Sequence, residues 1–173
     1  MINAFLQSVA KHVVAESTNL QATYDAKHIF NVKANANIDN GKLVNLDDMA
    51  WVDNEYFTMV EPTATSRVGL ILSVPIGADE RPKAATYEYN FYNGKDEIMR
   101  VYDLLIGDKF TVSANGISGG NAVKKGAYIV ADGYDLKAQA AKPTNVAFFG
   151  EIVDVINRGA NGLYYKIFVR KNG

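Results

Sequence analysis

The sequence predicts a mainly β protein: a small β-barrel or β-sandwich with a short N-terminal helix or arm and an inserted loop region. Two observations predict the β body, namely short runs rich in β-branched and aromatic residues, and Asn-Gly or Asp-Gly pairs between them. A third, a stretch of helical periodicity near the start, predicts the helix. With 173 residues, 48% of them hydrophobic, the chain can form one domain with a sizeable core.

The first 27 residues are expected to form an N-terminal helix or arm followed by a polar connector. Apolar residues at helical spacing predict a short amphipathic helix over residues 2–16. That helix could cap the core of its own chain or dock as an arm on a neighbouring subunit, and the sequence leaves both open. The apolar residues concerned are Phe5, Leu6, Val9 and Val13.

Residues 28–173 are expected to form a single β domain, interrupted by an irregular insertion around residues 75–97. Alternating tyrosines also indicate a strand near residues 87–92, with Tyr89 and Phe91 on one face. Further strands are predicted at 56–60, 68–74, 98–102, 109–113, 128–130, 146–153 and 163–169. Tight turns are predicted at Asn40-Gly41, Asn93-Gly94, Asn115-Gly116, Asp132-Gly133 and Asn161-Gly162.

No pattern of residues that carries chemistry is found, so we expect a protein that is not an enzyme. The chain has no cysteine, which excludes disulfides, thiolate metal sites and a cysteine nucleophile. Its two histidines, His12 and His28, stand in no metal-ligand spacing and beside no nucleophile motif. The glycine-rich segment 116–126 does not match a phosphate-binding loop and precedes a strand. We therefore expect no catalytic residues, no metal site and no cofactor.

Charge and hydropathy limit the partners that the chain can take. The 18 basic and 19 acidic residues give a net charge of −1 with no basic stripe, so nucleic-acid binding is not expected. No run approaches the roughly 20 apolar residues that cross a bilayer, so no membrane partner is expected. The start of the chain is not typical of a signal peptide, and the lack of cysteine suits synthesis in a cytoplasm.

The order of these elements resembles the small head decoration (cement) proteins, or head auxiliary proteins, of tailed bacteriophages. The resemblance spans roughly residues 28–169. It is carried by residues 38–44, the apolar strand 69–73 with the acidic loop after it, residues 107–113 and residues 149–153. It implies a non-enzymatic protein that binds the outer surface of an icosahedral capsid and stabilises it. It also implies a major capsid protein as partner, a homo-oligomer with a trimer favoured, and a place on the virion after synthesis in the host cytoplasm.

Three segments are candidates for the contact surface of such a protein. They are the N-terminal arm, an acidic loop, and the region of the single tryptophan, because Trp and Tyr are enriched among interface anchors. Burial tendencies favour a place in the core for a lone tryptophan over a place in an interface. The candidate residues are Phe5, Leu6, Val9, Trp51, Tyr56, Asp79, Glu80 and Arg81.

Other functions remain open from the sequence. A tail-tube, connector or head-fibre component of a virion has a β body of the same kind. A free carbohydrate- or ligand-binding β module could use some of the 10 tyrosines as stacking platforms. A hydrolase with an unfamiliar site is the least supported reading, since no nucleophile and base stand out.

Overall fold

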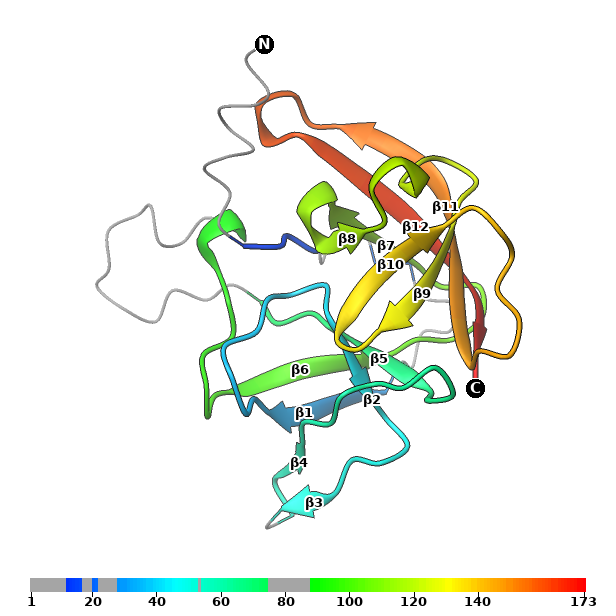
Figure 1. The fold of residues 1–173 in the computed structure, drawn as a ribbon. Coiled ribbons are helices and arrows are strands. Elements are labelled where there is room, and N and C mark those ends of the chain that lie inside the picture. Colours follow the sequence, from blue (N-terminus) through cyan, green and yellow to red (C-terminus); the bar gives the residue numbers. More distant parts are fainter. Residues whose placement is uncertain (1–11, 17–19, 22–27, 53, 75–87) are drawn as a thin grey trace.

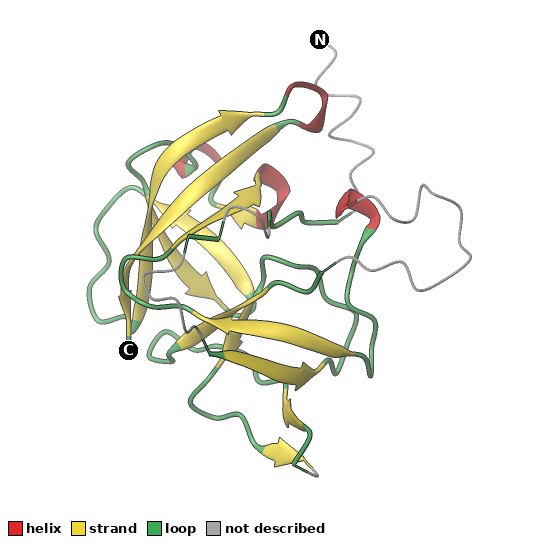
Figure 2. Cartoon of the chain, turned by 180° about the vertical axis from the view of Figure 1, so that it is seen from behind, coloured by secondary structure: helices red, strands yellow, loops and turns green. Residues whose placement is uncertain are grey.

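The computed structural model describes residues 12–16, 20–21, 28–52, 54–74 and 88–173. It confirms a mainly β protein, built from two curled, mixed sheets of six strands, each resembling half a barrel (Figure 1). The described residues contain short 3₁₀ turns and no α-helix, as the colouring of Figure 2 shows. These turns are η3 (Glu88–Asn90), η4 (Ala114–Gly116), η5 (Gly120–Ala122) and η6 (Gly159–Asn161).

The first sheet has the strand order β2-β5-β6-β1-β4-β3. Its pairs are antiparallel except β1 and β4, which run parallel with Val32 opposite Phe57. β3 forms one end of this sheet. The strands are β1 (Ile29–Lys33), β2 (Leu43–Asn45), β3 (Trp51–Val52), β4 (Tyr56–Thr58), β5 (Val68–Ile71) and β6 (Ile98–Asp103).

The second sheet has the order β7-β12-β11-β9-β10-β8, antiparallel except for the parallel pair β10 and β8. Two predicted turns make its hairpins: Gly133 (φ 61°) joins β9 to β10, and Gly162 (φ 84°) ends the turn from β11 to β12. The strands are β7 (Lys109–Ser113), β8 (Ile117–Ser118), β9 (Tyr128–Asp132), β10 (Asp135–Gln139), β11 (Phe148–Asn157) and β12 (Leu163–Asn172).

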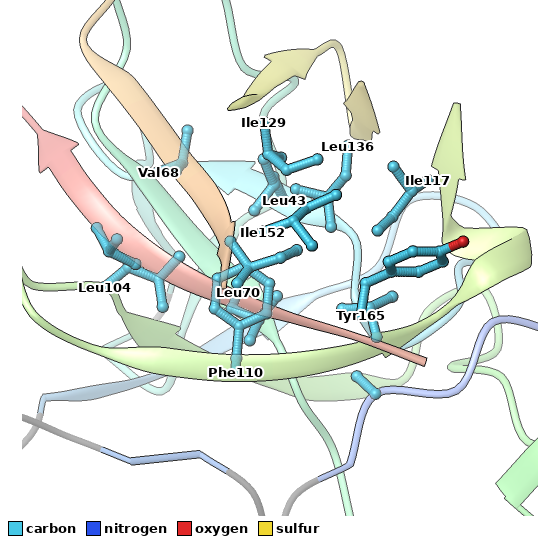
Figure 3. Close-up of a cluster of buried hydrophobic side chains, with 14 of the residues drawn as sticks. Leu43, Val68, Leu70, Leu104, Phe110, Ile117, Ile129, Leu136, Ile152 and Tyr165 are labelled. Carbon is cyan, nitrogen blue, oxygen red and sulfur yellow. The ribbon is translucent and has the colours of Figure 1, made fainter. Parts of the chain in front are cut away.

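Two clusters of buried apolar side chains stabilise the sheets. The first joins the second sheet to β2 and β5, with Leu43 and Leu70 meeting Phe110 and Ile152 (Figure 3). The second cluster is formed by residues of β1, β2, β5 and β6 and the segments beside them. Neighbouring residues of β2 and of β5 belong to different clusters, so these two strands are buried on both faces. Members of the second cluster are Val32, Ala34, Ile38, Val44, Met59, Ile71, Met99 and Val101.

Two expectations about local structure are wrong where the structure describes them. Residues 12–16, the end of the expected helix, are extended, and Ala15 forms a β-bridge with Val112 of β7. Their apolar side chains fill the space beside that strand, and a strand edge satisfies their backbone groups as a helix would. The expected strand near residues 87–92 is instead the turn η3 at residues 88–90. The remainder of the expected helix lies outside the described residues.

Candidate interaction surface

β3, β4 and the loop before them, residues 46–52 and 54–58, form a projection that we call the aromatic hairpin. It lies at the end of the first sheet and extends away from the body of the molecule, at the bottom of Figures 1 and 2. In the register of the two strands Trp51 is opposite Phe57, and Val52 is opposite Tyr56. The backbone of Thr58 donates to the Ala50 carbonyl at 2.9 Å, and the Thr58 hydroxyl accepts from the Ala50 amide at 3.0 Å. The hairpin is therefore fixed at its base by both backbone and side chain.

A row of rings runs across the face of this sheet that carries the second core cluster. Trp51 packs on Phe57 with centroids 4.0 Å apart, and Phe57 meets Phe30 edge to face at 5.4 Å. Phe30 in turn contacts the ring of His28 at 4.2 Å. Phe30 and Phe57 are partly buried against the core cluster, whereas Trp51 remains 62% exposed. The row of rings extends beyond the core, so its last ring, that of Trp51, is exposed to solvent.

This exposure shows that the tryptophan is not a core residue. The alternating pattern of a half-buried strand puts a large apolar side chain inward, and Trp51 does point to the core face. However, the strand lies beyond the edge of the core. An indole that is not needed for the core and is held by a neighbouring ring has the properties of an interface anchor.

Tyr56 lies in the same hairpin but on its opposite face. The ammonium of Lys33 lies 5.5 Å from the centre of its ring and 3.6 Å from a carboxylate oxygen of Asp96. Ile29 and Ile98, on the same outer face of β1 and β6, are 42% and 49% exposed. The structure thus brings Trp51 and Tyr56 into one element without making one continuous aromatic surface of them.

The loop that leads into the hairpin is acidic, and its carboxylates hold the loop in place. The side-chain oxygen of Asn45 accepts from the amides of Asp47 and Asp48, and its nitrogen donates to Asp48 at 2.7 Å. Asp47 also accepts from the Arg67 amide at 2.7 Å. Glu55, at the tip between β3 and β4, is exposed. The described residues contain no group of three or more potential metal ligands, here or elsewhere.

The N-terminal segment contacts its own chain where it is described. Val13, Val14 and Ala15 are buried, and the segment pairs with the free edge of β7 through Glu16 N to Thr111 O and Ser113 N to Val14 O, at 3.0 and 2.8 Å. An open strand edge of this kind would otherwise expose unpaired backbone groups. Residues 12–16 therefore cover the edge of the second sheet.

Polar side chains fasten this segment at both ends. Asp39 accepts from the Val13 amide at 2.9 Å and lies 2.7 Å from Nδ1 of His12, whose ring stacks on Tyr92. At the other end Glu16 accepts from Nε and Nη2 of Arg158, both at 3.0 Å. The hydrogen bond and charge of Glu16 raise the pKa of Arg158 above its ordinary value. Both contacts hold residues 12–16 against the second sheet. The contact between His12 and Asp39 therefore has a structural role.

Some candidates cannot be placed on this surface. Phe5, Leu6 and Val9 of the expected arm, and Asp79, Glu80 and Arg81 of the acidic loop, lie outside the described residues. Sequence reasoning missed Phe30 and Phe57, which support Trp51. The alternation in residues 29–33 and 56–58 is the signal that marks their inward positions, but their meeting depends on the parallel pairing of β1 and β4.

None of the helices that the structure describes is long and apolar enough to cross a membrane. Comparisons of the chain with protein-family models, with curated proteins and with solved structures give no match.

Proposed function

We propose that the chain is a non-enzymatic virion structural protein that binds the outer surface of an icosahedral phage capsid and stabilises it. The proposal rests on the resemblance to decoration proteins and on one observation of the structure. That observation is the aromatic hairpin, in which a 62% exposed Trp51 projects beyond the core on a fixed scaffold. Large exposed aromatic side chains are costly to leave in water and are enriched where proteins bind each other.

A decoration protein needs a rigid body and a few anchoring side chains more than it needs a deep pocket. Each contact contributes modestly, and a protein present in many copies, or as an oligomer, adds these contributions through multivalency. Two packed β sheets supply the rigid body, and the hairpin supplies an anchor. In this proposal the body is a small barrel or sandwich, preceded by an N-terminal arm and interrupted by an inserted loop.

The remaining parts of the proposal follow from this role. The partner is the major capsid protein, and the chain acts as a homo-oligomer, with a trimer favoured, on the capsid surface after synthesis in the host cytoplasm. It uses no cofactor, no nucleic acid and no membrane. Another virion part, such as a tail tube, connector or head fibre, would use the same kind of body and differ in its place and copy number.

A carbohydrate- or ligand-binding module is the second candidate, and one observation favours it. An exposed indole stacked on a second ring is a flat apolar platform on which a sugar ring could lie. A glycan array and a thermal-shift ligand screen test this candidate, and a flat result in both would exclude it.

The first experiment is the number of copies of this chain per major shell protein, measured by quantitative mass spectrometry of purified particles. A ratio near one supports a protein that covers the whole lattice. A few copies per particle would point to a vertex, connector or tail part, and absence from particles would refute a virion role.

A binding assay then tests the hairpin itself. Purified protein is added to capsids that lack it, and the bound fraction is measured by co-sedimentation. Trp51→Ala is expected to lower binding about tenfold or more, as the loss of a central aromatic anchor does. The matched control is Ile106→Ala, because Ile106 is 61% exposed but lies in the turn between β6 and β7. Equal binding by the two variants would refute the role of the hairpin.

A further inference from the structure

The outer face of the second sheet carries cations and aromatic rings. The strand register places Lys109 of β7, Phe168 of β12, Glu151 of β11 and Tyr128 of β9 side by side across this sheet. Their neighbours in the register, Phe110, Ile167, Ile152 and Ile129, point into the first core cluster. We call the surface formed by Lys109, Tyr128, Lys142, Phe149, Glu151, Phe168 and Arg170 the basic face.

Cations lie over two of the rings of the basic face. Phe168 has the Lys109 ammonium at 5.8 Å and the Arg170 guanidinium at 4.5 Å from its centroid. The Lys142 ammonium lies 6.0 Å from the centroid of Phe149, and this ring meets Tyr128 at 6.2 Å. A cation over a ring contributes favourably and still keeps its charge for a partner.

The charges of this face are only partly balanced. Arg170 forms an ion pair with Glu151 at 2.6 Å, so the carboxylate of the basic face is already paired. Lys109 and Lys142 have no ion pair with any of the described residues. A chain of net charge −1 thus has a local excess of positive charge on this face.

The aromatic hairpin has the opposite charge. Between residues 47 and 55 the sequence has Asp47, Asp48, Asp53 and Glu55 and no lysine or arginine. Among these Glu55 is exposed at the tip, four residues from Trp51. Two hairpins facing each other would bring like charges together, which disfavours a symmetric contact between them.

We propose that the aromatic hairpin of one copy docks on the basic face of a second copy of this chain. The acidic hairpin, with Glu55 at its tip, lies against Lys109 and Lys142, and the indole of Trp51 stacks among cations and rings. Tryptophan is the side-chain ring that binds a cation best. The hairpin extends from the end of the first sheet, whereas the basic face belongs to the second sheet, so the contact joins different copies (Figure 1).

A contact between two different patches is head to tail. Repeating it generates a closed ring if the rotation closes and an open chain if it does not. This inference rests on the proposed function, because copies joined through the hairpin present several weak capsid contacts together, and the hairpin left free at the end of such a chain can still contact the capsid. Unlike the proposed function, the contact between copies can be tested on the purified protein without any capsid.

The test is self-association of the full chain, followed by sedimentation velocity over a range of concentrations at low and high salt. The wild type is expected to associate at low salt and to dissociate as salt rises, because the contact depends on charge. Glu55→Lys and Lys142→Glu are each expected to weaken association roughly tenfold, and the double variant Glu55→Lys/Lys142→Glu to restore it. Lys125→Glu is the control for net charge, since Lys125 is an exposed lysine outside both surfaces.

The single tryptophan provides a direct second readout. Acrylamide quenching of Trp51 fluorescence is expected to fall as the wild type associates and to stay high in Glu55→Lys. A chain that remains monomeric at low salt, or a double variant as weak as the single variants, overturns the proposal. Capsid binding by a chain that is always monomeric would overturn this inference and leave the proposed function standing. Association of the wild type at low salt without any binding to capsids would do the reverse.

Discussion

Gly116 gives the sharpest test of how the N-terminal strand is packed. A Cβ atom at this glycine would lie 2.4 Å from Cγ1 of Val13 and 2.6 Å from Cγ1 of Val112. Its φ is not positive, so the backbone itself accepts alanine and the effect is one of space alone. Neither valine can move away easily, because both are at most 5% exposed. Gly116→Ala therefore forces a strand that is packed on both sides to shift.

We expect Gly116→Ala to lower the free energy of unfolding by about 1–3 kcal/mol, the usual cost of overpacking a core. In a domain of this size each kcal/mol lowers Tm by about 2–4 °C. The matched control is Gly94→Ala, in a second Asn-Gly pair whose φ is also not positive. There the added Cβ meets only the carboxylate of the exposed Glu97, at 3.0 Å or more, and we expect a change within about 0.5 kcal/mol.

Urea denaturation followed by circular dichroism measures both variants. The same substitution is then repeated in a Val13→Ala background, where one of the two clashes is gone. The cost of Gly116→Ala should fall there, with a coupling of about 0.5–3 kcal/mol between the two sites. Equal stability of Gly116→Ala and Gly94→Ala, or an unchanged cost in the Val13→Ala background, would refute the packing argument.

Three further predictions concern other parts of the molecule. Asp39→Ala removes the acceptor of the Val13 amide and the partner of His12, so it should lower the free energy of unfolding by about 1–3 kcal/mol and speed exchange of the Val13 amide in NMR; an unchanged exchange rate would contradict it. Trp51 is 62% exposed, so acrylamide should quench its fluorescence in the folded monomer nearly as well as in urea, and strong protection in a dilute monomer would contradict the structure. Burial, with a smaller contribution from the charge of Glu61, raises the pKa of Tyr134 above its ordinary value of 10.0, although a hydrogen bond with Asn35 opposes this. The unfolded chain therefore loses this proton first, and stability should decline as pH rises from about 10 through the folded pKa; Tyr134→Phe should flatten that decline in urea titrations, and an identical pH slope would contradict the assignment.

Much of the β body could be predicted because its strands have local signals. Residues 109–113 alternate in the way a half-buried strand does, and β7 has these bounds. The turns at Gly133 and Gly162 were predictable because glycine adopts the positive φ that tight hairpins need. In the Asn115-Gly116 pair, however, the glycine has a different role: it leaves room for Val13, which lies more than a hundred residues earlier in the chain. No local pattern contains that information.

The N-terminal strand and the hairpin show the same limit. Four apolar residues at helical spacing predict a helix over residues 2–16, yet residues 12–16 are extended because the edge of β7 accepts their backbone hydrogen bonds. The exposure of Trp51 depends on where the second core cluster ends, which in turn depends on the parallel pairing of β1 and β4. Sequence could nominate Trp51 by its residue type, but the rings of Phe30 and Phe57 that support it come from separate segments.

Strands β2 and β5 have a mechanical consequence. Since Leu43 and Leu70 face one cluster while Val44 and Ile71 face the other, the two strands form a common wall between the clusters. A force applied to the aromatic hairpin is transmitted through the first sheet to β2 and β5 and from these strands to the second sheet. Neither half can loosen without exposing apolar surface of the other, so the described body should resist force as one unit and yield in a single step.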